Sequence, residues 1–144
     1  NSKFGTIDLN RYKLESFLLT TENKEVNNII GISMTDKDCH IREHFADIIG
    51  EKRLLEANAI LCKQLPYEKN YFTAASIIEA MGKLGIPENA TYIDEWLSEN
   101  VTDILETKNY FVLKHIRIAL SKLDPVRRKS FDEKYLIYLG EFIN

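Results

Sequence analysis

The segment from His40 to His44 has the residue types and spacing best suited to chemistry. It reads His-Ile-Arg-Glu-His, which matches the H-x-x-E-H pattern of inverted zinc peptidases. On a helix, His40 and His44 share one face, where two imidazoles can bind zinc while Glu43 acts as general base. Such an enzyme also needs a downstream carboxylate ligand and a substrate cleft, and the sequence contains no recognisable second element of that kind. The alternative is a polar helix face, so we expect neither a metal nor a cofactor.

No other motif predicts catalysis. Asp94 and Glu95 point about 100° apart on a helix, and no His or other polar partner is placed to complete an acid–base pair with them. Cys39 and His40 are adjacent in the chain, which is poor geometry for a nucleophile and its base. The sequence has no G-x-S-x-G motif, no phosphate loop and no dinucleotide fingerprint. We therefore expect a protein that is not an enzyme and has no catalytic residues.

Charge is distributed unevenly along the chain. The 144 residues carry a net charge of −3. Residues 84–107 hold six Asp or Glu and no Lys or Arg, whereas residues 108–134 hold eight basic residues against three acidic ones. The near-neutral total therefore conceals a local charge of −6 followed by one of +5.

The acidic stretch contains the candidate binding site for a partner. Four residues, related by steps of three and four, are predicted to share one flank of a helix: Tyr92, Glu95, Trp96 and Glu99. The candidate partner-binding residues are Tyr92, Asp94, Glu95, Trp96, Glu99 and Asp103. Carboxylates beside aromatic anchors suit a basic protein partner. The alternative is an ordinary solvated helix face, with Trp96 in the core.

The basic stretch raises nucleic acid as another partner. Lys114, Arg117 and Ser121 lie along one helix face, and three basic residues follow at 127–129. The acidic helix would be a close neighbour and would repel phosphate groups. This argues against nucleic acid binding.

A helical period in the hydrophobic pattern predicts the elements that position these residues. From Tyr71 to Leu84 the apolar residues recur at steps of three and four. Asn70 is a suitable N-cap for this helix, and Gly85 suits its C-terminal end. A second helix follows at once, with Pro87 in its first turn.

The same signals recur along the rest of the chain. Thr35-Asp36-Lys37-Asp38 resembles a capping box that opens a helix ending at Gly50. A further apolar stripe, stopped by Pro66, consists of Leu54, Leu55, Asn58, Leu61, Cys62 and Leu65. Asn109 caps a helix to Leu123, and Asp124-Pro125 opens a last helix to about Phe142. Two shorter helices are expected over 8–19 and 22–32. The chain is predicted to be all-α, with about eight antiparallel helices in one domain, paired as 8–33, 36–65, 70–106 and 109–143.

An internal repeat underlies these pairs. Asn70-Tyr71-Phe72 aligns with Asn109-Tyr110-Phe111 at an offset of 39. Downstream, Ile77, Ala80 and Leu84 meet Ile116, Ala119 and Leu123 at the same offset. A weaker copy around Phe45 to Gly50 precedes them by 32. A period of this length is typical of paired-helix repeats that stack into a solenoid, because one pair alone cannot bury its apolar face.

Residues 74–88, Ala-Ala-Ser-Ile-Ile-Glu-Ala-Met-Gly-Lys-Leu-Gly-Ile-Pro-Glu, resemble a HEAT repeat of the short bacterial type. In that family the first helix of a pair tends to end in an Ala-Leu-Gly-Lys-Leu-Gly phrase before the turn. The likeness extends over 70–99, less closely over 109–139 and weakly over 36–65. It implies a short, curved HEAT-like α-solenoid whose second helices, including the acidic one, line the concave side.

The resemblance and the missing catalytic set together imply a protein that binds another protein. The two cysteines form no CxxC motif, and no apolar run approaches 18 residues, so a cytoplasmic protein with no membrane association is expected. The most concrete form is an immunity protein that neutralises a bacterial toxin, such as a nuclease of a contact-dependent inhibition system. This form rests on a resemblance of class: small, all-helical and mildly acidic. The partner would be a basic toxin domain, and the protein itself would be a monomer before it binds that domain. The alternative is a HEAT-repeat scaffold or adaptor module of a larger assembly.

Overall fold

The computed structural model describes residues 23–140, and this part of the chain is all-helical and without strands. The expected helix over 8–19 lies outside the described residues, as does the end of the last helix beyond Gly140. The α-helices are α2 (Asn23–Ser33), α3 (Cys39–Lys52), α4 (Asn58–Gln64), α5 (Tyr71–Leu84), α6 (Asn89–Thr107), α7 (Tyr110–Leu123) and α8 (Pro125–Tyr135). Three 3-10 turns accompany them: η1 (Leu55–Ala57), η2 (Leu65–Tyr67) and η3 (Leu136–Leu139). None of the described helices is long and apolar enough to cross a membrane.

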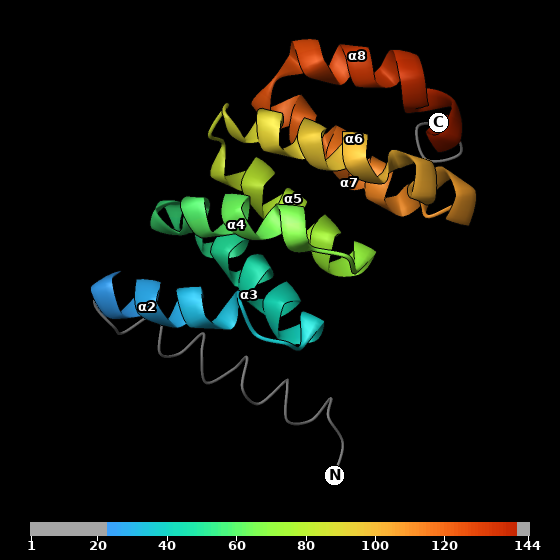
Figure 1. The fold of residues 1–144 in the computed structure, drawn as a ribbon. Coiled ribbons are helices and arrows are strands. Elements are labelled where there is room, and N and C mark those ends of the chain that lie inside the picture. Colours follow the sequence, from blue (N-terminus) through green and yellow to red (C-terminus); the bar gives the residue numbers. More distant parts are fainter. Residues whose placement is uncertain (1–22, 141–144) are drawn as a thin grey trace.

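The helices form two rows that enclose the hydrophobic core. In one row α3 packs against α5, and α5 packs against α7. The other row consists of α2, α4, α6 and α8, which lie one above another in Figure 1. The two rows meet through α4 on α5, α6 on α7 and α8 on α7. One continuous cluster of buried residues runs from Ile30 in α2 to Leu139 in η3.

Small residues bring the helices of the first row close together. A Cβ placed on Gly50 of α3 would lie 3.0 Å from the Cα of Ala80 in α5. A Cβ placed on Gly82 of α5 would lie 3.0 Å from both the Cα and the Cβ of Ala119 in α7. Ala80 and Ala119 are equivalent at the offset of 39 residues, and Gly50 and Gly82 are equivalent at the offset of 32. The same contact therefore joins two successive pairs of helices.

Three of the predicted helix boundaries are confirmed in detail. The side chain of Asn70 accepts a hydrogen bond from the backbone N–H of Thr73 at 3.1 Å, as an N-cap does. Gly85 ends α5 with φ = 73°, in the left-handed region that favours glycine. Asp124 caps α8 by accepting from two backbone N–H groups, and Pro125 occupies its first turn.

The predicted capping box at Thr35 is wrong. The Thr35 hydroxyl donates backward to the carbonyl of Ile32 at 2.9 Å, at the C-terminal end of α2. Asp36 accepts from the backbone N–H of Asp38 at 2.8 Å, which makes a local turn. Asp38 is the N-cap of α3 and accepts from the N–H of His40 at 2.9 Å. The Thr35 hydroxyl thus bonds to the end of α2, and Asp38 takes the N-cap position of α3 instead.

Several other predicted ends differ from the structure. Gly50 lies inside α3, where the close approach of Ala80 requires glycine, and α3 ends at Lys52. Pro87 precedes α6, which begins at Asn89. Asn109 occupies the N-cap position of α7 without a capping bond from its side chain, which donates to Thr107 instead. The last α-helix ends at Tyr135, and the 3-10 turn η3 follows.

Candidate functional site

The sequence predicts an acidic surface on the helix of residues 84–107, and α6 carries exposed carboxylates on one side. We define this acidic face as Glu88, Glu95, Glu99 and Glu106, all of which are exposed. Successive members are seven, four and seven residues apart, which places them on one side of the helix and of the residue that precedes its first turn. Among the described residues none of the four takes part in an ion pair. The face therefore presents four carboxylates that no cation of residues 23–140 neutralises.

The six predicted binding residues are not all on this face. Tyr92 is 43% exposed and Glu95 and Glu99 are exposed beside it, as predicted. Asp94 lies on another side of α6, where it forms an ion pair with Arg127 of α8. Asp103 is exposed but accepts a hydrogen bond from the hydroxyl of Tyr71. The structure thus leaves three of the six residues exposed on one side of α6: Tyr92, Glu95 and Glu99. The two carboxylates among them form no ion pair within the described residues.

The expectation that Trp96 is a surface anchor is wrong. Its side chain is only 2% exposed. The indole N–H donates to the carbonyl of Glu68 at 3.4 Å, and the ring meets Tyr71 edge to face with centroids 6.0 Å apart. Trp96 therefore joins α6 to the core, which is the alternative that the sequence left open.

The neighbouring residue Glu68 anchors a buried ion pair. Its carboxylate is 1% exposed and accepts two hydrogen bonds of 2.8 Å from the guanidinium of Arg42. This pairing raises the pKa of Arg42 above its usual value. Arg42 also donates to the carbonyl of Asp36. The arginine of the His40–His44 segment thus ties α3 to the loop before α5, a structural role.

A groove of about 570 Å³ opens between α4 and the N-terminal half of α6. Its rim carries two partly exposed apolar side chains, Leu55 at 56% and Tyr92 at 43%. The other lining residues are Glu56, Asn58, Ala59, Cys62, Lys63, Ile86, Glu88 and Asn89. The acidic face of α6 begins at this groove, because Glu88 belongs to both.

The floor of this groove is a closed hydrogen-bond network. The amide of Asn89 donates to Asn58 at 2.8 Å and to the carbonyl of Met81 at 3.1 Å. Its oxygen accepts from the amide of Asn58 at 3.0 Å and from the thiol of Cys62 at 3.3 Å. Two donors and two lone pairs are the full capacity of an amide side chain. Burial also raises the pKa of the Cys62 thiol, so this cysteine is a poor nucleophile.

A second groove, of about 400 Å³, lies between α6 and α8. The ion pair between Asp94 and Arg127 lies at its edge, and Lys134 lines it as well. Leu97, Val101 and Phe131 supply apolar surface. Charges of both signs therefore line this groove, in contrast to the acidic face.

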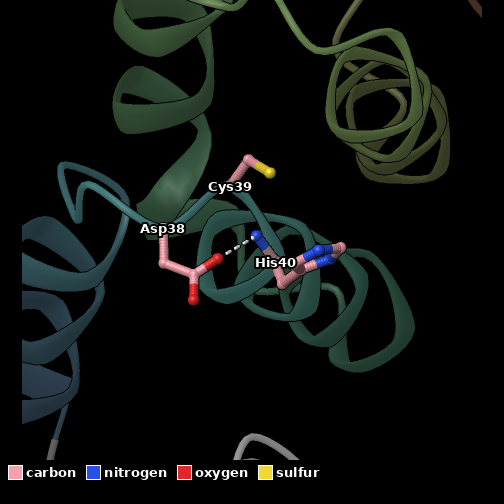
Figure 2. Close-up of side chains that lie close together, drawn as sticks. All are labelled: Asp38, Cys39 and His40. Atoms are coloured by element: carbon pink, nitrogen blue, oxygen red, sulfur yellow. Dashed lines mark hydrogen bonds between the residues drawn. The ribbon is translucent and has the colours of Figure 1, made fainter. Parts of the chain in front are cut away.

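Within residues 23–140, no group of three potential metal-ligating side chains contains both histidines of the H-x-x-E-H segment. Among the described residues, the one group of at least three potential metal-ligating side chains within 4.8 Å of one another is Asp38, Cys39 and His40. Figure 2 shows these three neighbours leaving the backbone in different directions at the start of α3. Asp38 caps the helix, and the thiol of Cys39 accepts from the amide of Asn70 at 3.5 Å. Glu43 and His44 are not part of the group.

Sequence reasoning missed the residues that η1 and α4 contribute to the first groove. Leu55, Asn58 and Cys62 were assigned to an apolar stripe, and the pattern alone did not say which element that stripe would meet. One signal was available: Asn58 occupies a core position in an otherwise apolar stripe, and a buried amide requires a polar partner. Asn89, one residue after Glu88, is that partner.

Comparison with known proteins identified no relative of this chain. No protein-family model matches the sequence, and neither a curated protein nor a solved structure shows significant similarity to it.

Proposed function

We propose that this chain is a non-enzymatic protein that binds a basic partner protein through the acidic face of α6. The observation that supports this most directly is the set of four exposed carboxylates without an ion pair among the described residues. Residues 84–107 contain no Lys or Arg, so the helix itself offers no neutralising charge. Such a surface attracts a cationic partner and orients its approach.

The most concrete form of the proposal is an immunity protein that neutralises a bacterial toxin, such as a nuclease. A nuclease binds phosphate groups, so its active site is basic and is complementary to a carboxylate-rich helix. Covering that site with α6 excludes the substrate without any chemistry by the inhibitor. A helical build and mild acidity support this form, which places the protein in the cytoplasm with its partner.

The proposed architecture is a HEAT-like α-solenoid. Two repeated contacts support it. The approach of Gly50 to Ala80 recurs between Gly82 and Ala119. A tyrosine at the start of the first helix also meets a later aromatic ring in two of the pairs: Tyr71 of α5 meets Trp96 of α6, and Tyr110 of α7 meets Tyr138 of η3 with centroids 5.3 Å apart. The same repetition is compatible with a scaffold module of a larger assembly, which is the competing form.

The first test of the proposal is to identify the partner and then reverse the charge of the face. The tagged protein is purified from its native host, and the proteins bound to it are identified by mass spectrometry. A single basic toxin domain, inactive in the complex, supports the inhibitor. Several unrelated partners support the scaffold.

The double variant Glu95→Lys/Glu99→Lys should weaken binding of the basic partner strongly, because it replaces two attractions by two repulsions. The melting temperature should hardly change, since both side chains are exposed. Binding is measured by calorimetry. A matched pair of single variants controls for total charge: Glu99→Lys changes the face, and Glu133→Lys makes the same change at an exposed position of α8. Equal effects of the two single variants, or unchanged affinity in the double variant, would overturn the proposal.

A further inference from the structure

The groove between α4 and α6 is an apolar anchor site at the end of the acidic face. We propose that it receives an apolar side chain from a lysine- or arginine-rich segment of the partner protein. This inference rests on the proposed function and adds to it the place and the chemistry of the anchor.

The rim of the groove supplies the apolar contact. Leu55 from η1 and Tyr92 from α6 both line the groove, and roughly half of each side chain remains exposed. Ile86 adds partly buried apolar surface to the same lining. The volume of about 570 Å³ is ample for one large side chain together with the backbone that carries it.

The floor selects against a polar occupant. Asn58 and Asn89 bond to each other, and the remaining groups of Asn89 are taken by Met81 and Cys62. Because no side-chain donor or acceptor of Asn89 is left over, a polar group placed against Asn89 would lose hydrogen bonds to water without gaining one from this amide. An apolar side chain has no such cost.

The negative charge around the groove favours basic residues on either side of the apolar side chain that the groove receives. Glu56 and Glu88 stand at the rim, and Glu95 and Glu99 continue the negative surface along α6. Lys63 is the one basic residue among the lining residues. The second groove, between α6 and α8, lacks this asymmetry because Arg127 and Lys134 accompany Asp94 there. The first groove therefore fits an apolar anchor with basic neighbours.

The test uses three short fluorescent peptides of equal length as probes. One combines Lys with Leu, one combines Lys with Ser at the same charge, and one combines Glu with Leu. Binding is measured by fluorescence anisotropy. The Lys/Leu peptide should bind about tenfold more tightly than the Lys/Ser peptide, which is what burial of one apolar side chain provides. The Glu/Leu peptide should not bind.

Two variants locate the contact. Leu55→Ser/Tyr92→Ser should abolish the advantage of the Lys/Leu peptide and leave the affinity for the Lys/Ser peptide unchanged. Ile137→Ser is the matched control, because it removes an apolar side chain that is 83% exposed on η3, away from the groove. Thermal unfolding verifies that all variants fold.

The two cysteines provide an independent footprint. Cys62 lies at the floor of the groove, whereas Cys39 lies at the start of α3. Alkylation by N-ethylmaleimide is followed for each thiol by peptide mass spectrometry. The Lys/Leu peptide should slow alkylation of Cys62 and leave that of Cys39 unchanged; the Lys/Ser peptide should affect neither.

The outcomes separate this inference from the proposed function. If both lysine peptides bind in a manner that depends on Glu95 and Glu99, but neither the serine variants nor Cys62 protection distinguishes them, the anchor site is wrong and the acidic face stands. If neither lysine peptide binds, the proposed function fails and the anchor site fails with it.

Discussion

The phenol of Tyr71 links the core to the exposed side of α6. Its ring packs against Trp96, and its hydroxyl donates to the carboxylate of Asp103. Burial, followed by the hydrogen bond and charge of Asp103, raises the pKa of Tyr71 from 10.0 to about 12. Both effects favour the neutral phenol, because a phenolate would be less hydrated here and would face a carboxylate.

This shift predicts a loss of stability at alkaline pH. The folded state holds the Tyr71 proton more tightly than the unfolded state does. The stabilising contribution is therefore complete below pH 10 and is lost as the pH rises towards about 12. The free energy of unfolding, measured by urea titration across that range, should fall more steeply in the wild type than in Tyr71→Phe. Tyr67→Phe, at a position 74% exposed, is the control. Equal slopes for the wild type and Tyr71→Phe would contradict the prediction.

At the scale of the helices, close packing of the first row depends on glycine at two positions. Gly82 lies in the middle of the contact between α5 and α7, and Gly50 has the same role between α3 and α5. An interior glycine costs a helix about 1 kcal/mol relative to alanine. Its presence here therefore reflects the need for a short distance between helices rather than helix formation.

The variant Gly82→Ala should lower the melting temperature, although alanine is the better helix former. Its methyl group would lie 3.0 Å from the backbone of Ala119, so α5 and α7 would have to move apart. Gly31→Ala in α2 is the matched control, because a Cβ there meets nothing within 4 Å. It should raise stability by about 0.5–1 kcal/mol. Ala119→Gly should partly rescue Gly82→Ala, so that the double variant is less destabilised than the sum of the single ones. Additive effects would contradict the contact. Calorimetry measures the melting temperatures of the three single variants and of the double variant.

At the scale of the whole molecule, the first row ends in a polar face on α7. On α5, the side turned to α7 carries Ala75, Ile78 and Gly82, all buried. At the offset of 39 residues, α7 carries Lys114, Arg117 and Ser121 on the corresponding side. Arg117 pairs with Asp132 of α8, and Lys114 and Ser121 are exposed. A further helix cannot pack on this face of α7, as α7 packs on α5, without burying these polar groups.

This polar face predicts that the chain remains a monomer when free. Stacking a second copy on α7 would bury the charges of Lys114 and Arg117, a cost that burial of the neighbouring Ile118, 41% exposed, is too small to offset. Sedimentation equilibrium should give a mass near 16.7 kDa at all accessible concentrations. A stable dimer would show that another surface associates, with the exposed Val126 and Ile137 as the first positions to substitute.

Local physics made a large part of this protein predictable from its sequence. The caps at Asn70 and Asp124 and the left-handed Gly85 were predicted because each depends only on residues a few positions away. The all-helical class follows from the period of the apolar residues for the same reason. The unbalanced charge of residues 84–107 is a property of composition, and the exposed carboxylates of α6 retain it.

Packing between distant segments decided the rest. Only the tertiary structure brings Trp96 to the backbone of Glu68, pairs Asp94 with Arg127 and places Tyr92 in the same groove as Leu55. These partners lie 28, 33 and 37 residues apart. The helical period of α6 gives the angle between its side chains but not which neighbour each side will meet. The acidic surface was therefore encoded in the sequence, whereas the groove between α4 and α6 arises from how the helices pack.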